Sequence, residues 1–356
     1  MTQNAQRNCE AEVNLLAAAR EAQWSAAAFM GPGAVKLVAP AKVNLVLAIG
    51  ARRPDGYHNA DTVMHALALH DTVYLRIEAA TADEVAQAAA AAAAAGRDDV
   101  ALGGPVDNLL VSIDLADRTG AAGSIAAADN LAFIAADRLA RAVGWEDLAH
   151  VQLRIEKHIP AQAGLGGGSS DAAAVLVGLA AQWGLAADDE RVGECARTLG
   201  ADVAFFLHGG CAQLDGVGEV LRRRLTSSKR AVVLVKPAAG VSTAEAFRRF
   251  DEAPLAVPDE VLKAIENADD AVEVPLFNNL AAASEALLPE LSAVRAWLAE
   301  RVGAENVLLS GSGSATYALA DSFSQASALA TAASAEGWWA RPTTLSGLRA
   351  AQVPGR

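Results

Sequence analysis

The sequence predicts a two-domain protein of the α+β class. Its 356 residues, 53% of them hydrophobic and 20% charged, provide enough apolar material for two packed cores. Residues 151–183 have the pattern of a strand, a glycine-rich loop and a helix. Val232 to Val235, followed by Lys236 and Pro237, independently predicts the first strand of a second domain.

The strand, loop and helix at residues 151–183 predict a phosphate site. Hydrophobic and polar residues alternate from Val151 to Glu156, as in a half-buried strand, and Pro160 ends it. Four of the five residues from Gly164 to Gly168 are glycine, which lets several amide hydrogens converge on one ligand. Ser169 to Asp171 offer capping side chains to the following helix, whose positive N-terminus favours an oxyanion. The alternative is that the glycines only form a flexible connection or a tight contact between helix and strand.

Two common nucleotide loops do not fit this segment. The nucleoside triphosphatase loop requires a lysine beside its last serine or threonine, and Gly168 occupies that place. In the dinucleotide fingerprint counted from Gly164, the third required glycine falls on Ser169. The sequence therefore predicts a phosphate loop of another kind.

Charge and cysteine content restrict the partners and the compartment. The net charge of −13 argues against nucleic acid or an anionic membrane as a partner, since both select for basic patches. The first 30 residues carry charges where a secretory signal would be apolar, and Cys9, Cys195 and Cys211 are spaced for neither a disulfide framework nor a zinc site. We expect a cytoplasmic protein whose phosphate site takes positive potential from a helix N-terminus, a lysine or a divalent cation.

A candidate lysine lies in the apolar segment 35–50. Alternation along this predicted strand places on one face Lys42, Asn44, Val46 and Ala48. A cation and an amide on an aliphatic strand are costly unless that face is solvated or lines a site with partners for both. The face is therefore either an exposed sheet edge or part of a functional site.

Asp202, like Lys42, is a charged residue in an apolar segment, because it stands directly ahead of the apolar run 204–207. It is either a helix cap after Gly200 or a buried acid held by a cation. A phosphate loop, a strand lysine and an aspartate together form the set that phosphoryl transfer to a hydroxyl requires.

Two further segments have alternative interpretations. Residues 310–314 contain Gly311 and Gly313 between two strand-like runs, and would form either a simple hairpin or a second backbone cradle. Tyr57 and His58 follow a turn, and either stack on a flat ring and bond its edge or cover core.

With these residues assembled, the chain resembles the GHMP kinase family, which includes galactokinase, homoserine kinase, mevalonate kinase and phosphomevalonate kinase. The matching segments occur in the family's order and are APAKVNLVL (Ala39 to Leu47), RPDGYH (Arg53 to His58), PAQAGLGGGSSDAAA (Pro160 to Ala174), LGADVAFF (Leu199 to Phe206) and LSGSGSAT (Leu309 to Thr316). The glycine loop is typical of the whole family, whereas the first two segments together are typical of one branch.

The resemblance implies a cytidyl substrate. The γ-phosphoryl group of ATP, with Mg²⁺, would pass to the 2-hydroxyl of 4-diphosphocytidyl-2-C-methyl-D-erythritol in the non-mevalonate (MEP) isoprenoid pathway. Asp202 would accept the hydroxyl proton, and Lys42 would keep Asp202 ionised and neutralise charge at the transferring group. Asn44, Tyr57 and His58 would bind the substrate, with the tyrosine stacked on cytosine and the histidine reading its edge. The loop around the ATP phosphates would comprise Pro160, Ala161, Gln162, Ala163, Gly164, Leu165, Gly166, Gly167, Gly168, Ser169 and Ser170.

The resemblance also implies the two-domain GHMP kinase fold. An N-terminal ATP-binding domain would occupy residues 34–225, with an alanine-rich insertion near 81–100 that forms a helix or a disordered loop. A ferredoxin-like C-terminal domain would occupy residues 230–345, with the active site in the cleft between the two. Residues 1–33 would be an N-terminal extension, either an added helix or the product of a misassigned start.

Several points stay open at this level. The ligands of Mg²⁺ are unassigned, and the protein would be a monomer or a homodimer. One alternative function is a GHMP kinase with another hydroxyl acceptor, such as homoserine or a mevalonate derivative. The other is a catalytically silent relative that binds a metabolite.

Overall fold

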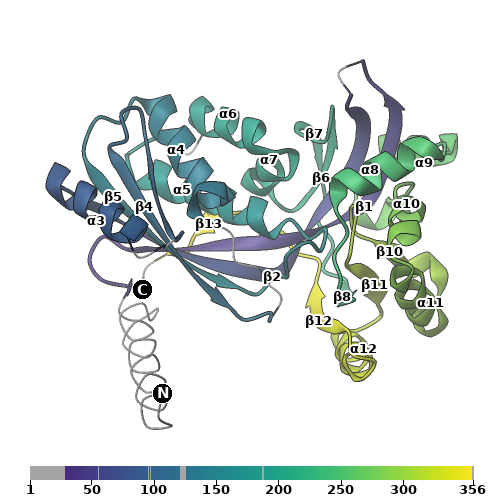
Figure 1. Ribbon diagram of the computed structural model, residues 1–356. Coiled ribbons are helices and arrows are strands. Elements are labelled where there is room, and N and C mark those ends of the chain that lie inside the picture. The colour runs from purple at the N-terminus through teal and green to yellow at the C-terminus, as the bar shows by residue number, and fades with distance from the viewer. Residues whose placement is uncertain are drawn as a thin grey trace, which may run out of the picture.

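The computed structural model describes residues 29–54, 56–94, 96, 98–120, 126–186 and 188–354. Within these ranges the chain forms two sheets with helices packed on them (Figure 1). Residues 1–28 of the expected N-terminal extension lie outside the described part. Of the helices in the described ranges, none is both long and apolar enough to span a bilayer.

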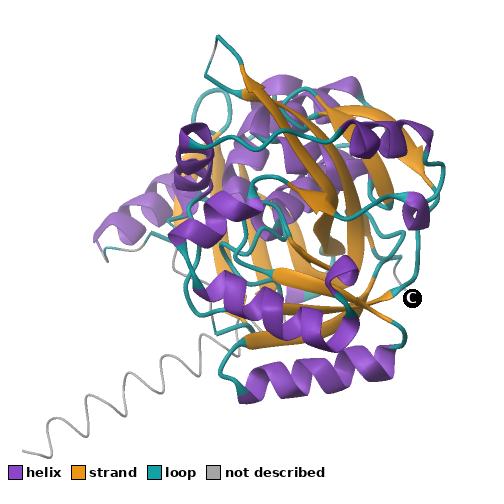
Figure 2. Cartoon of the chain, turned by 90° about the vertical axis from the view of Figure 1, so that its right-hand side faces the viewer, coloured by secondary structure: helices purple, strands orange, loops and turns teal. Residues whose placement is uncertain are grey.

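The larger sheet is built on a long antiparallel hairpin of β1 and β2. The strand order is β13-β1-β2-β5-β4-β3, while β6 pairs with β2 and β7, and β9 pairs with β1. The tip of the hairpin projects beyond the neighbouring helices (Figure 2). The strands of this sheet are β1 (Val35–Arg52), β2 (His58–Ala79), β3 (Val100–Gly103), β4 (Leu109–Asp117), β5 (Ala149–Lys157), β6 (Cys211–Asp215), β7 (Val220–Leu225), β9 (Phe277–Asn278) and β13 (Ala351–Gln352).

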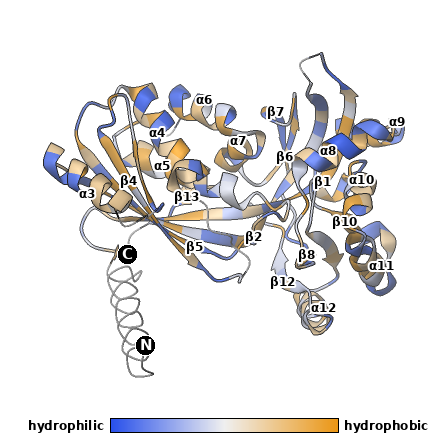
Figure 3. Cartoon of the chain, viewed as in Figure 1, coloured by the Kyte–Doolittle hydropathy of each residue, from blue (hydrophilic) through white to orange (hydrophobic). Residues whose placement is uncertain are grey.

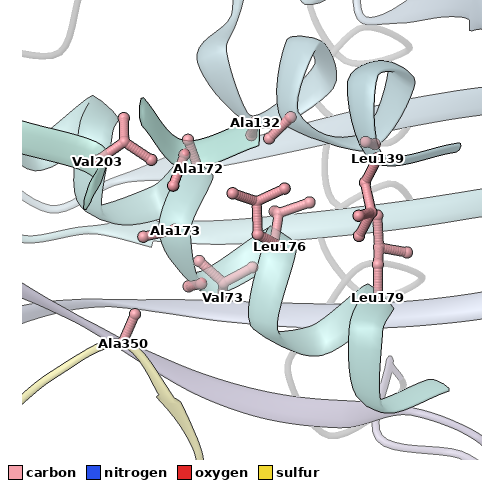
Figure 4. Packing of buried hydrophobic residues seen from close by; sticks show 14 of the residues in the cluster. Val73, Ala132, Leu139, Ala172, Ala173, Leu176, Leu179, Val203 and Ala350 are labelled. Atoms are coloured by element: carbon pink, nitrogen blue, oxygen red, sulfur yellow. The ribbon is translucent and has the colours of Figure 1, made fainter. Parts of the chain in front are cut away.

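Helices cover one face of the larger sheet, and α5 is the most deeply buried of them. Small residues allow this burial: a side chain at Gly178 would lie 3.1 Å from Leu37 of β1. The colouring by hydropathy shows α5 as largely apolar (Figure 3), and Figure 4 shows its Leu176 and Leu179 packed between the sheet and α4. The helices of this lobe are α3 (Ala82–Ala94), α4 (Leu131–Val143), α5 (Gly167–Gln182), α6 (Glu190–Leu199) and α7 (Ala201–His208), with a 3-10 turn at Ala127–Asp129.

The alanine-rich insertion forms the helix α3, which decides between the two predicted alternatives. Alanine has the highest helix propensity of all residues, and α3 has nine alanines in the segment ADEVAQAAAAAAA. Its first turn carries Asp83 and Glu84, whose negative charges interact favourably with the positive end of the helix dipole. The insertion contacts β3 and lies away from the glycine loop (Figure 1).

The smaller sheet has the ferredoxin-like arrangement that the resemblance implies. Its chain order is strand, helices, two strands, helix, strand, and its spatial order is β10-β11-β8-β12 with every pair antiparallel. The predicted strand at residues 232–235 is the central β8. The elements of this lobe are β8 (Ala231–Lys236), β10 (Val307–Leu309), β11 (Thr316–Ala320), β12 (Trp339–Thr344), α8 (Thr243–Glu252), α9 (Asp259–Asn267), α10 (Ala281–Leu287), α11 (Glu290–Val302) and α12 (Phe323–Ala335), with 3-10 turns at Ala271–Glu273 and Ala304–Asn306.

We call the larger sheet with α3 to α7 the N-terminal lobe, and the smaller sheet with α8 to α12 the C-terminal lobe. The chain crosses between them more than once, because β9 and β13 both pair with β1. A hydrophobic cluster also joins the lobes, since it contains Val43 and Leu45 of β1 together with Leu234 of β8 and Tyr317 of β11. The middle of β1 therefore lies where the two lobes meet.

Candidate active site

The glycine loop joins β5 to α5 as predicted, but the helix begins earlier than expected. Its N-cap is Gly166, which has a left-handed backbone with φ of 72°, and the helix proper starts at Gly167. Ser169 and Ser170 therefore lie inside the first turn, and the prediction that they cap the helix was wrong. Among the described residues no side chain caps α5, so its first amide groups are left available to an anion.

A second loop, residues 310–314, packs directly on the glycine loop. It connects β10 to β11, so it is both a hairpin and a partner of the first loop. The Ser310 hydroxyl donates to the carbonyl of Gly164 at 2.9 Å, and the amide of Ser314 donates to the carbonyl of Gln162 at 3.1 Å. A side chain on Gly164 would lie 2.0 Å from the Ser310 carbonyl oxygen, which explains the glycine there. The C-terminal lobe thus fixes the conformation of the phosphate loop.

Lys42 and Asp202 lie side by side although they are far apart in the sequence. Lys42 Nζ is 3.5 Å from Asp202 Oδ2 and donates to Asn44 Oδ1 at 2.7 Å. Lys42 is only 3% exposed, so the exposed-edge alternative does not apply to it. The side chain of Asp202 is 29% exposed and stands in the first turn of α7, where Gly200 is the N-cap. Asp202 is therefore the acid beside a cation rather than the helix cap.

The predicted alternation along β1 holds only as far as Asn44. A register shift in the pairing with β2 follows Asn44, and beyond this bulge Leu47, not Val46, lines the same pocket as Lys42. A bulge adds one residue to one strand and so turns the following side chains to the other face. No local feature of the apolar segment indicated this change.

Residues that the sequence did not single out hold Asn44 in place. Its amide donates to the Thr62 hydroxyl at 2.9 Å, and Thr62 in turn donates to the carbonyl of Val46 at 2.7 Å. The fully buried Tyr317 of β11 donates its hydroxyl to the Asn44 carbonyl at 3.0 Å. Each of these buried polar groups has a partner, so the orientation of Asn44 toward Lys42 is fixed from both lobes.

A pocket of about 330 Å³ lies between the lobes at this point. The N-terminal lobe contributes polar groups, and the C-terminal lobe contributes the ring of Phe247 and the loop around Gly311. The lining residues are Lys42, Asn44, Leu47, Ala60, Thr62, Met64, Gly164, Ser169, Gly200, Ala201, Asp202, Val217, Gly218, Thr243, Phe247, Leu280, Gly311 and Ser312. Basic, acidic and phosphate-loop residues thus share one cleft.

Tyr57 and His58 lie at the start of β2 near the hairpin tip, and neither is among the residues that line this pocket. Tyr57 is 65% exposed, whereas the side chain of His58 is 7% exposed and is enclosed by α8. The ring centroids of Phe247 and Phe250 lie 5.7 and 5.8 Å from that of His58. Sequence reasoning missed these two phenylalanines, because a residue some 190 positions away leaves no signal near the RPDGYH segment.

A buried charge cluster behind the glycine loop was also missed. Lys157, at the end of β5, donates to Asp71 of β2 and to Asp171 of α5, at 2.6 Å in the second case. Asp71 also accepts from the amides of His158 and Ile159. The cluster ties the entry of the loop and the start of α5 to the sheet. Burial raises the pKa of the Asp171 carboxyl to about 7, and the nearby Lys157 only partly opposes this rise.

The raised pKa of Asp171 predicts a pH-dependent stability. The pKa of the Asp171 carboxyl is about 7 in the folded protein instead of the usual 3.8, so the folded state binds this proton more tightly than the unfolded state does. The protonated carboxyl therefore contributes to stability at low pH, and this contribution is lost as the pH rises from 3.8 to about 7. We expect the free energy of unfolding of Asp171→Asn to fall less steeply than that of the wild type over this window. Denaturant titrations at a series of pH values measure both. Parallel profiles for the two proteins would contradict the assignment.

Comparison with known proteins gives the class of this protein. Residues 130–210 match the N-terminal domain of the GHMP kinases, and residues 259–337 match their C-terminal domain. A relative from Desulfitobacterium hafniense is 36% identical over 302 residues, which cover 83% of this chain and 90% of the relative. The chain belongs to the GHMP kinase family. That relative is named 4-diphosphocytidyl-2-C-methyl-D-erythritol kinase, as is one from Nocardia farcinica that is 36% identical over 91% of this chain and 96% of its own length.

Solved structures agree with this assignment. A crystal structure of 4-(cytidine 5'-diphospho)-2C-methyl-D-erythritol kinase is 32% identical, with a TM-score of 0.63 over 88% of this chain and 99% of that one. Homoserine kinase from Cytophaga hutchinsonii is 17% identical, with a TM-score of 0.59 over 91% and 98%, and shares the fold. The two-domain GHMP kinase fold predicted from the sequence is thereby confirmed.

Proposed function

We propose that this protein transfers the γ-phosphoryl group of ATP to the 2-hydroxyl of 4-diphosphocytidyl-2-C-methyl-D-erythritol, in the MEP pathway to isoprenoid precursors. The observation that carries the proposal is the Lys42–Asp202 pair, whose charged groups are 3.5 Å apart in the cleft that the glycine loop also lines. The relatives that bear the name of this kinase align with most of the chain and support the choice of acceptor.

The residues present fit a nucleotide polyphosphate. Residues 160–170 provide backbone amides in a loop whose Gly164 and Gly166 have positive φ and no room for a side chain, and the uncapped start of α5 adds its positive end. Mg²⁺ is held mainly by phosphate oxygens and waters, with only one or two protein oxygens, and Ser169, which lines the same pocket, would offer its hydroxyl as one of these. When bound, the ion would supply neutralisation of the phosphate charge.

Asp202 would act as the base that accepts the proton of the substrate hydroxyl. Its carboxylate reaches into the cleft, and Lys42 beside it neutralises the charge that spreads over the transferring group. Asn44 accepts a hydrogen bond of 2.7 Å from the Lys42 ammonium, and it lines the same pocket, where it would contact the acceptor. Phosphoryl transfer then needs only positioning and charge stabilisation, without a covalent intermediate on the protein.

The base of the substrate would lie at the outer end of the cleft. The exposed ring of Tyr57 offers a stacking face, and Phe247 lines the cleft from the opposite lobe. A cytidine moiety between these aromatic rings and a diphosphate pointing inward would bring the erythritol hydroxyl toward Asp202. Aromatic rings suit a nucleotide-linked acceptor better than homoserine or a mevalonate derivative, because neither of those carries a base on which a ring could stack.

The domain limits 34–225 and 230–345, a cytoplasmic location and the absence of nucleic-acid or membrane partners belong to the same proposal. They are supported by the change of sheet between β7 and β8 and by the net charge of −13. A monomer or homodimer would suffice, since both lobes of the cleft come from one chain.

An acceptor panel tests the proposed function. Purified protein with Mg-ATP is incubated with the cytidyl substrate, homoserine and mevalonate, and ADP release is measured by a coupled assay. We expect turnover only with the cytidyl substrate. Preference for another acceptor would reassign the substrate within the family, and ADP release with none of them would favour the silent binding relative.

Tyr57→Ala tests the stacking role. Loss of a base-stacking ring costs about 1–3 kcal/mol, so we expect the KM for the cytidyl substrate to rise roughly tenfold to a hundredfold, with the KM for ATP within about twofold of wild type. Tyr57 is 65% exposed, so folding should be unaffected. Steady-state kinetics with each substrate varied in turn gives both constants. Equal changes in the two would argue against stacking on the base.

A further inference from the structure

Two consecutive asparagines lie at the end of β9, where the two lobes meet. Asn278 is the last residue of β9 and pairs with Leu47 of β1, and Asn279 follows it directly. Both residues are buried, so each side-chain amide needs hydrogen-bond partners within the protein. The two side chains have different partners, and this difference separates their roles.

Asn278 holds the carbonyl groups of the two residues on either side of Ser310. Its Nδ2 donates to the carbonyl of Leu309 at 2.9 Å and to that of Gly311 at 2.8 Å. Its Oδ1 accepts from the amide of Leu280 at 2.9 Å. All three bonds require the same orientation of the amide group, so a single arrangement of this side chain satisfies them. Asn278 therefore fixes the backbone at the start of the loop 310–314.

Ser310 connects this fixed backbone to the glycine loop. Its hydroxyl donates to the carbonyl of Gly164 at 2.9 Å, and its amide donates to the carbonyl of Ala315 at 2.9 Å. The two loops are in close contact, because a Cβ on Gly164 would lie 2.0 Å from the Ser310 carbonyl oxygen. A displacement of Ser310 therefore either moves the glycine loop or breaks the hydrogen bond between the loops.

Asn279 forms the same number of side-chain hydrogen bonds, but with other partners. Its Oδ1 accepts from the amide of Ile49 at 2.9 Å, and its Nδ2 donates to the carbonyls of Ile49 and Leu255 at 2.9 and 2.8 Å. Neither Ile49 nor Leu255 belongs to the two loops or to the lining of the pocket at Lys42. Asn279 is thus a control of the same residue type, with the same number of bonds, at the next position.

We propose that Asn278 is a positioning residue for ATP, because it keeps Ser310 against Gly164 and so keeps the amides of the glycine loop arranged for the phosphates. The inference rests on the proposed function, since it concerns the nucleotide site. Groups that are already arranged bind a ligand more tightly than groups that must be ordered on binding. Asn278 acts on the nucleotide only through the loop 310–314, with which it forms two hydrogen bonds.

The test compares Asn278→Ala with Asn279→Ala. Each substitution leaves two carbonyl groups without their donor, so we expect both to lower the melting temperature to a similar extent. Calorimetric titration with Mg²⁺ and a non-hydrolysable ATP analogue, below both melting transitions, gives the Kd. We expect Asn278→Ala to raise the Kd at least about tenfold, as loss of roughly one hydrogen bond would, and Asn279→Ala to stay within about twofold of wild type. Equal changes in the two variants, or none in Asn278→Ala, would overturn the proposal.

A double variant tests the route through Ser310. Ser310→Ala removes the hydroxyl that bonds to Gly164, so it should also raise the Kd of the analogue. If Asn278 acts through Ser310, the double variant of Asn278→Ala and Ser310→Ala should bind about as weakly as the weaker single variant. Two effects that multiply would overturn this route. If Asn278→Ala does not fold, Asn278→Asp replaces it, because aspartate keeps the size of the side chain and the acceptor for Leu280 but loses both donors.

The same measurements separate this proposal from the proposed function. The comparison of Kd values requires no acceptor, so a wild type that binds the analogue but does not phosphorylate the cytidyl substrate would overturn the proposed function alone. A folded wild type that does not bind the analogue would overturn both.

Discussion

Replacement of Asp202 by asparagine is expected to abolish phosphoryl transfer while the protein folds and binds ATP. The asparagine keeps the shape of the side chain and offers an oxygen to Lys42, but it cannot accept a proton from the substrate hydroxyl. A positioned general base contributes about 10²–10⁴-fold to the rate, so we expect kcat to fall by roughly three orders of magnitude. Single-turnover and steady-state assays measure this loss.

The binding of ATP separates this effect from misfolding. Asp202 is 29% exposed, and Lys42 retains its bond to Asn44, so the affinity for nucleotide and the melting temperature should stay close to wild type. Titration with a fluorescent ATP analogue and thermal denaturation provide the two controls. Turnover within tenfold of wild type in a folded, ATP-binding variant would remove Asp202 from the role of base.

Gly164→Ala is expected to have the largest effect on stability. The residue has a φ of 72°, and a Cβ there would lie 2.0 Å from the Ser310 carbonyl oxygen, so backbone of one loop must move. Strain of this kind costs about 1–3 kcal/mol, and separation of the two loops adds the loss of the Ser310 hydrogen bond, about 1 kcal/mol. We expect a fall of roughly 3 kcal/mol in the free energy of unfolding, measured by denaturant titration, together with weaker binding of ATP.

Gly168→Ala provides a matched control in the same segment. Gly168 lies in the helical part of the loop, and the nearest atom to its added Cβ would be Leu131 Cδ1 at 3.8 Å, an ordinary contact. Alanine is favoured over glycine inside a helix by about 0.5–1 kcal/mol, so this variant should be at least as stable as wild type. Similar destabilisation by both substitutions would show that the contact with Ser310 is not the cause.

Part of this architecture could be predicted because it depends on local patterns in the amino-acid sequence. The strand before the glycine loop, the helix after it and the strand at residues 232–235 all follow from alternation, glycine content and apolar runs. The convergence of Lys42 with Asp202 was inferred from the family resemblance, since no periodicity relates residues that lie 160 positions apart.

The remainder depended on tertiary contacts that leave no local signal. Asp71 reads as an ordinary polar residue of a strand until Lys157 and Asp171 are placed beside it. Gly166 is the N-cap of α5 in a left-handed conformation, at a place where Phe206 and Lys42 leave no room for a side chain, and neither contact can be inferred from the loop sequence. The enclosure of His58 by α8 likewise requires the docking of one lobe on the other.

The pairing of β13 with β1 has a consequence for biosynthesis. β1 is synthesised long before β13, yet Leu37 and Val38 of β1 pair with Gln352 and Ala351. Until β13 has been synthesised, that stretch of β1 lacks this partner strand in the nascent sheet, and open edges recruit strands of other chains. Residues 351–352 therefore protect a segment that is exposed during most of the synthesis of the two lobes.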